Sequence, residues 1–235
     1  MNIVDYVILG IIGLSVLWGF YRGFIQSVLN MGGCLAALVG SFYVYPHLAG
    51  MIQSNEGLVR SLIHYTDASS RLGDLELALT NVSNLGQNTL NTILTNVNLP
   101  EPLSSLLSYN LENQVFASQN ITTVSDYVNQ TIVAVSINII CFLLCFLAIY
   151  LVISMVCNLL RAVFRFPLLK QLDWLVGGIF GALRGVIFCY AIFVLIPLVQ
   201  TVLPFEELTL LMNESTLAPI FNNGNLILSI MNRAF

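Results

Sequence analysis

Charged side chains are scarce in this sequence. Asp, Glu, Lys and Arg make up 9% of its 235 residues, whereas an ordinary soluble domain carries about 25%. So few charges could not coat a soluble globule of this size. The eight basic residues are scattered and form no stripe or patch, so we expect no nucleic-acid partner.

Residues that carry catalysis or hold metals are also few. His47 and His64 are the two histidines, and neither has partners at ligand spacing. No phosphate-binding glycine loop, His-Glu-x-x-His motif or nucleophile elbow occurs. The five cysteines lie in apolar runs, and Cys141 and Cys145 share a helical face without a histidine or carboxylate to complete a metal site. We therefore predict a non-enzymatic protein with no catalytic residue, cofactor or metal.

Long apolar runs are abundant, and 57% of the residues are hydrophobic. Four runs can cross a bilayer, which takes about 20 mostly apolar residues: 4–21, 24–45, a stretch within 127–160, and 174–203. Because the runs are continuous rather than alternating, they predict helices and not barrel strands. The first run should be a retained span, since no Lys or Arg precedes it as in a signal peptide. The predicted fold class is an all-α integral membrane protein with four transmembrane helices.

The predicted spans divide the chain into four parts. Residues 1–45 form a first transmembrane hairpin, 46–131 a polar insert, 132–203 a second hairpin, and 204–235 a tail. Apolar residues near 226–231 predict a short interfacial helix in the tail.

The insert carries seven acids and two bases, yet it keeps helical periodicity. We expect a cap of short amphipathic helices, packed on its own spans, on the membrane surface or on a partner, and we favour its own spans. The predicted apolar faces are Leu72, Leu75, Leu79 and Val82; Leu90, Ile93, Leu94 and Val97; and, beyond a break at Pro100, Leu103, Leu106 and Leu107.

Basic residues predict the orientation. Arg22 lies in the first short loop, and Arg161, Arg165 and Lys170 lie in the loop before the fourth span. Short cytoplasmic loops attract Lys and Arg. Both loops should therefore be cytoplasmic, which leaves the two termini and the insert outside.

Small residues recur every four positions on two spans. Such stripes let helix backbones approach closely in lipid, and we predict helix packing there; the alternative is a discontinuous helix that lines a pathway. The stripes are Gly32, Ala36 and Gly40, with Gly33, Ala37 and Ser41 alongside, and Gly177, Gly181 and Gly185.

Arg184 falls inside the fourth apolar run, at one of two depths. If the span begins at Trp174, Arg184 lies about 15 Å into it at 1.5 Å per residue, where it needs a carboxylate, carbonyl groups or water. If 172–184 form a shallow or re-entrant helix and 185–203 alone cross, Arg184 lies at the cytoplasmic edge and can snorkel to water. We favour the edge, with Arg22 as an anchor at the same face.

Two segments share the pattern Gly-x-x-Arg-Gly followed by an apolar residue, at 19–24 and 181–186. With their contexts they read Asp5-x-x-x-x-Gly10 leading to Gly19-x-x-Arg22-Gly23-Phe24, and Asp173-x-x-x-Gly177-x-x-x-Gly181-x-x-Arg184-Gly185. These strings resemble the colicin V production protein family (CvpA), over about 1–45 and 132–200. The resemblance implies a small multi-pass protein of the bacterial cytoplasmic membrane, whose founding member is linked to production or export of the peptide toxin colicin V. The insert is longer than expected for compact members.

The resulting function hypothesis is a non-enzymatic scaffold. It would support toxin production, secretion or envelope maintenance, with the lipid bilayer and other membrane proteins or further copies of itself as partners. The alternative is a small transporter or channel subunit, favoured by Arg184 and the possible re-entrant segment.

Overall fold

The computed structural model describes residues 1–66, 72–100, 103–117, 121–163, 170–202, 206–222 and residue 227. Apart from an isolated bridge between Asn81 and Thr123, the regular elements of this part are helices. The long ones are α1 (Ile3–Arg22), α2 (Phe24–Gln53), α8 (Val124–Val163) and α9 (Lys170–Phe193). The short ones are α3 (Glu56–Thr66), α5 (Leu75–Leu79), η1 (Val82–Asn84), α6 (Gln87–Val97), α7 (Leu103–Glu112), α10 (Leu195–Val202), α11 (Glu206–Glu214) and α12 (Ala218–Asn222).

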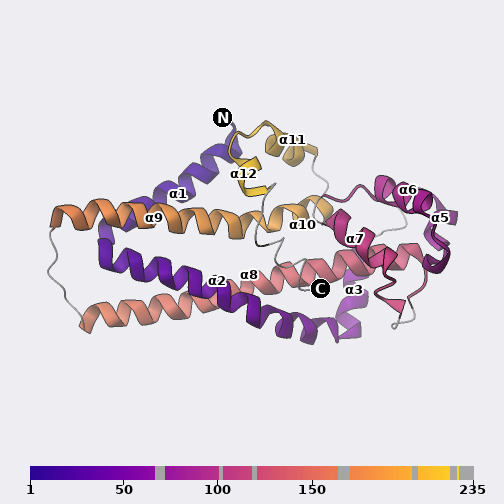
Figure 1. The fold of residues 1–235 in the computed structure, drawn as a ribbon, viewed down its shortest axis with the longest axis horizontal. Helices are drawn as coiled ribbons and strands as arrows, with labels where there is room; N and C mark the ends of the chain where they lie inside the picture. Colours follow the sequence, from indigo (N-terminus) through magenta and orange to yellow (C-terminus); the bar gives the residue numbers. More distant parts are fainter. Residues whose placement is uncertain are drawn as a thin grey trace.

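Four stretches of these helices are long and apolar enough to cross a membrane: Ile3–Arg22, Phe24–Gln53, Val124–Leu159 and Trp174–Thr201. The predicted all-helical class and the four helices that can span a membrane are therefore confirmed. In the elongated molecule of Figure 1, α8 and α9 run along the longest axis. Helix α1 packs on α9, and α2 packs on both α8 and α9.

One residue joins α1 to α2. Gly23 has φ 80°, a left-handed value that side chains disfavour, and its N–H donates to the Gly19 carbonyl at 3.0 Å. At the other end of α1, the Asn2 side chain accepts hydrogen bonds from the backbone N–H groups of Val4 and Asp5, which caps the helix. The two caps define α1 as a complete helix of 20 residues.

The second span is longer than predicted. Helix α2 continues through Pro46 to Gln53, so the boundary expected at residue 45 does not end the helix. Proline removes one backbone hydrogen bond, but the residues around it are held by packing, since Tyr45 and Ala49 are each 2% exposed. The start of the predicted insert is therefore the last part of α2.

The insert builds helices where periodicity is clear. In α6, Leu90, Ile93 and Val97 are buried, and α7 follows Pro100 with its own buried leucines. The face predicted from Leu72 to Val82 is wrong, because Leu75 is 71% and Leu79 64% exposed. The chain leaves the helix at Thr80, where extended backbone pairs with the residues that precede α8.

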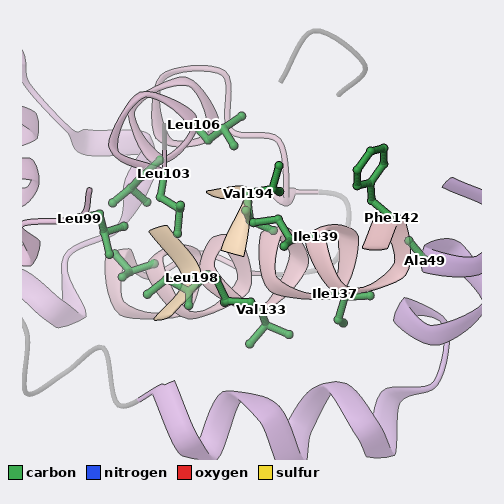
Figure 2. Packing of buried hydrophobic residues seen from close by; sticks show 14 of the residues in the cluster. Ala49, Leu99, Leu103, Leu106, Val133, Ile137, Ile139, Phe142, Val194 and Leu198 are labelled. Carbon is green, nitrogen blue, oxygen red and sulfur yellow. The ribbon is translucent and has the colours of Figure 1, made fainter. Parts of the chain in front are cut away.

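The insert shares a hydrophobic core with the long helices. Figure 2 shows Val133, Ile137, Ile139 and Phe142 of α8 among side chains from several other elements. These include Ala49 of α2, Leu103 and Leu106 of α7, and Val194 and Leu198 beside or within α10. The cap of α3 and α5–α7 is therefore packed on the chain's own helices, around the first part of α8 (Figure 1).

The fourth apolar run is interrupted near its end. Helix α9 stops at Phe193 and α10 starts at Leu195, because Pro197 has no N–H to donate to the carbonyl of Phe193. Beyond α10, the helices α11 and α12 lie beside α1 and α9. The interfacial helix predicted near 226–231 lies outside the described residues, except for Ile227.

Candidate functional site

Helices α1 and α9 meet at a glycine seam, formed by Gly19, Gly177, Gly181 and Gly185. A Cβ added at Gly177 would lie 2.6 Å from the carbonyl oxygen of Gly19, and one added at Gly181 would lie 2.5 Å from that of Ser15. A Cβ on Gly19 would collide with the carbonyl of Gly177. The two backbones are therefore in direct contact, and any residue larger than glycine at these positions would collide with the facing helix.

The stripe predicted on α2 is displaced by one residue. Gly32 and Ala36 are exposed, and a Cβ on Gly32 would meet nothing within 4 Å. Gly40 does face α8, through Ile149 at 3.4 Å. The buried stripe is instead Gly33, Ala37 and Ser41, because neighbouring residues on a helix point about 100° apart and this face is the one turned to α8.

Arg184 is buried among the helices. Its side chain is 8% exposed, and α9 passes through it without a break, so the shallow helix expected at 172–184 is not a separate segment. The guanidinium donates from Nε to Ser15 Oγ at 3.1 Å and from Nη2 to the Ser15 carbonyl at 3.4 Å. Ser15 Oγ in turn donates to the Gly181 carbonyl at 2.7 Å. Ser15 of α1 therefore contacts both Arg184 and the Gly181 carbonyl of α9.

Arg22 takes part in a second polar cluster near the turn at Gly23. Its Nη1 donates to Asn158 Oδ1 of α8 at 2.7 Å, and Gln26 Nε2 of α2 donates to the same oxygen at 3.2 Å. The Arg22 guanidinium also lies over the Trp18 ring, 4.8 Å from its centroid. This cluster ties α8 to both helices of the first hairpin.

A pocket of about 430 Å³ joins the two arginines. It is lined by Arg22 and Ser15 from α1, Asn30 from α2, Tyr150 and Ser154 from α8, and Arg184 from α9. The pocket is the place in the described structure where the two arginines of the Gly-x-x-Arg-Gly repeats come together.

Asp5 has a different role from the arginines. Its side chain is fully buried, and it accepts hydrogen bonds from the Ser215 hydroxyl at 2.6 Å and the Leu217 backbone N–H at 2.9 Å. The Asn2 amide donates to the Leu211 carbonyl at 2.5 Å. Residues at the start of α1 therefore hold the α11–α12 segment.

The remaining predicted motif residue is Asp173. Asp173 lies in α9, but its side chain is outside the described part of the chain. Within that part, no group of three or more His, Cys, Asp or Glu side chains is placed to hold a metal ion.

Sequence reasoning missed several members of the site. Ser15, Asn30, Tyr150 and Ser154 lie at no recognisable motif spacing, and helix packing alone brings them to Arg184. Each is a polar residue inside a predicted span, which is the one signal that could have selected them.

Comparison with known proteins gives one family. The family model described as Colicin V production protein matches residues 4–79 and 114–225. A relative named Colicin V production protein homolog, from Haemophilus influenzae, is 36% identical over 55 residues, which are 23% of this chain and 34% of the relative. The match thus spans about a third of that relative's length. No solved structure matches, and residues 80–113, with η1, α6 and α7, lie between the matched ranges.

Proposed function

Because the chain belongs to the colicin V production protein family, we propose that it supports production or secretion of a colicin V-like peptide toxin, or maintenance of the envelope, as a non-enzymatic membrane scaffold. The family and the H. influenzae relative support the link to toxin production. In this proposal the protein lies in the inner membrane of a bacterium, with both termini and the cap on the outer side. The scaffold binds other membrane proteins or further copies of itself.

The observation that carries the scaffold role is the cap on the extended α8. Helix α8 has 40 residues, about 60 Å at 1.5 Å per residue, whereas the hydrocarbon core of a bilayer is about 30 Å thick. A large part of α8 therefore extends beyond the bilayer and supports the cap. The cap exposes large apolar side chains, among them Leu75 and Leu79 of α5, Leu58 of α3 and Tyr109 of α7. Exposed apolar side chains outside a membrane suit contact with another protein.

Affinity purification tests the scaffold. The full chain, tagged and extracted from membranes in mild detergent, should retain defined partner proteins that mass spectrometry identifies. The double variant Leu75→Asp, Leu79→Asp should lose them, while Thr92→Asp, Thr95→Asp on the exposed face of α6 should keep them. Cells that carry the α5 variant should release less toxin activity than wild type, and cells that carry the α6 variant should release as much as wild type. If no protein co-purifies, or the α5 variant behaves as wild type in both assays, the scaffold proposal fails.

A transporter or channel subunit is the second candidate, and the burial of Arg184 favours it. Ionisable side chains within spanning helices are expensive and often mark pathways. The purified chain in liposomes would then conduct or exchange anions, and Arg184→Lys, which lacks the planar fork of donors, would reduce the flux. Under the scaffold proposal, flux stays at the level of empty liposomes.

A further inference from the structure

The pocket between the two arginines contains one buried guanidinium group, that of Arg184. Arg184 is 8% exposed, and within the described part of the chain no carboxylate lies within ion-pair distance of it. Its hydrogen bonds to Ser15 use two of the five guanidinium N–H groups. A buried charge without a counter-charge is costly. Arg22 lines the same pocket, so an anion inside it would face two guanidinium groups.

Neutral donors complete the polar wall. The Tyr150 and Ser154 hydroxyls of α8 and the Asn30 amide of α2 line the pocket together with Ser15. Asn30 is buried, and Gln26 beside it contacts its Oδ1 at 3.4 Å. Guanidinium groups and hydroxyls are the donors that bind a phosphate oxygen best, because each phosphate accepts several charge-assisted hydrogen bonds.

The pocket also has apolar lining residues, some of them exposed on the surface of the bundle. These residues are Ile11, Leu14 and Trp18 of α1 and Phe188 of α9, and Leu14 is 70% and Trp18 49% exposed. When α1 spans the membrane, these exposed side chains face the lipid. A ligand that suits both surfaces has a negative head group and apolar chains.

We propose that this pocket binds the phosphate group of an anionic phospholipid, with the phosphate at Arg184 and Arg22 and an acyl chain along the exposed side of α1. The site is independent of the toxin-production role, since it rests on the geometry of the bundle alone. A free phosphate ion offers the same head-group chemistry without the apolar chains. The experiment therefore separates a lipid phosphate from inorganic phosphate.

Native mass spectrometry of the full chain in detergent tests the site. Dioleoyl phosphatidylglycerol should bind one to one, whereas dioleoylglycerol, which has the same chains and no phosphate, should not. Arg184→Gln should weaken phosphatidylglycerol binding about tenfold, because a hydrogen bond to a charged group is lost. Arg60→Gln, which removes an exposed arginine of α3, should bind as wild type. Inorganic phosphate at millimolar concentration should compete weakly or not at all.

A second variant keeps the test decisive if Arg184→Gln unfolds. Ser154→Phe fills the pocket from α8 and leaves the arginine contacts in place, and it should abolish phosphatidylglycerol binding without lowering the unfolding temperature. Met155→Phe, at the next residue of α8 and 67% exposed, is the matched control and should bind normally.

If inorganic phosphate stabilises the chain and phosphatidylglycerol does not, the phosphate site stands and the lipid assignment is overturned. If neither binds, or if Ser154→Phe and Met155→Phe bind phosphatidylglycerol equally, the whole proposal is overturned.

Discussion

The Asp5 carboxylate accepts a hydrogen bond of 2.6 Å from the Ser215 hydroxyl, 210 positions later in the chain. The same carboxylate accepts the backbone N–H groups of Thr216 and Leu217, and Ser215 Oγ accepts the N–H of Ala218 at 2.9 Å. One buried side chain at the start of α1 thus holds the turn between α11 and α12.

Asp5→Asn should loosen that turn. The amide that replaces one carboxylate oxygen can donate but not accept, so it faces donors that need an acceptor. We expect limited proteolysis of the purified protein to cut within 206–222 much faster than in wild type. Glu214→Gln, an exposed side chain at the end of α11, should leave the cleavage rate unchanged. Equal cleavage in Asp5→Asn and wild type would mean that the contact does not hold the segment.

Gly19→Ala should destabilise the bundle. Its added methyl group collides with the backbone carbonyl of Gly177, and overpacking of this kind costs about 1–3 kcal/mol. The thermal unfolding midpoint in detergent should fall. Gly13→Ala on the same helix is the control, because its methyl group meets no atom within 4 Å. A midpoint for Gly19→Ala that matches Gly13→Ala would contradict the close contact of α1 and α9.

The neighbouring glycines of α2 provide a second matched pair. A Cβ on Gly33 lies 2.7 Å from Ile153 Cγ2 of α8, so Gly33→Leu should lower the unfolding midpoint strongly. Gly32→Leu points to open space and should be tolerated. Size-exclusion chromatography with light scattering supplies the other readout. If Gly32→Leu changes the oligomeric state, the exposed stripe packs against a second copy.

Cysteine labelling should establish the orientation. The native cysteines Cys34, Cys141, Cys145, Cys157 and Cys189 are all buried, so they give little background. In intact cells, a membrane-impermeant maleimide should label Ser83→Cys in the exposed part of the cap. The reagent should reach Gln171→Cys only after the membrane is opened. The reverse pattern would place the cap in the cytoplasm.

The sequence could predict the features that repeat at short range. Continuous apolar runs predict the spanning helices, and the glycines of α9 recur on one face, which is the face that meets α1. Periodicity also predicts α6 and α7, because Leu90, Ile93 and Val97 are spaced for one buried side.

Features that depend on a partner element could not be predicted. The choice between Gly32 and Gly33 depends on which face of α2 meets α8, and both stripes have the same spacing. Leu75 and Leu79 both lie in α5, but extended backbone at Thr80, whose carbonyl accepts the N–H of Val124, ends the helix before Val82. The burial of Arg184 depends on Ser15 of α1, which accepts its hydrogen bond and is 169 positions away.

The turn at Gly23 has a consequence for how the protein is made. A linker of one residue, Gly23, is too short for α1 to enter the lipid while α2 stays in water. When both helices span the bilayer, we expect them to insert together, as one helical hairpin. A bulky residue at position 23 would harm this step of biogenesis before any assembled protein existed, and its effect would appear as low membrane yield.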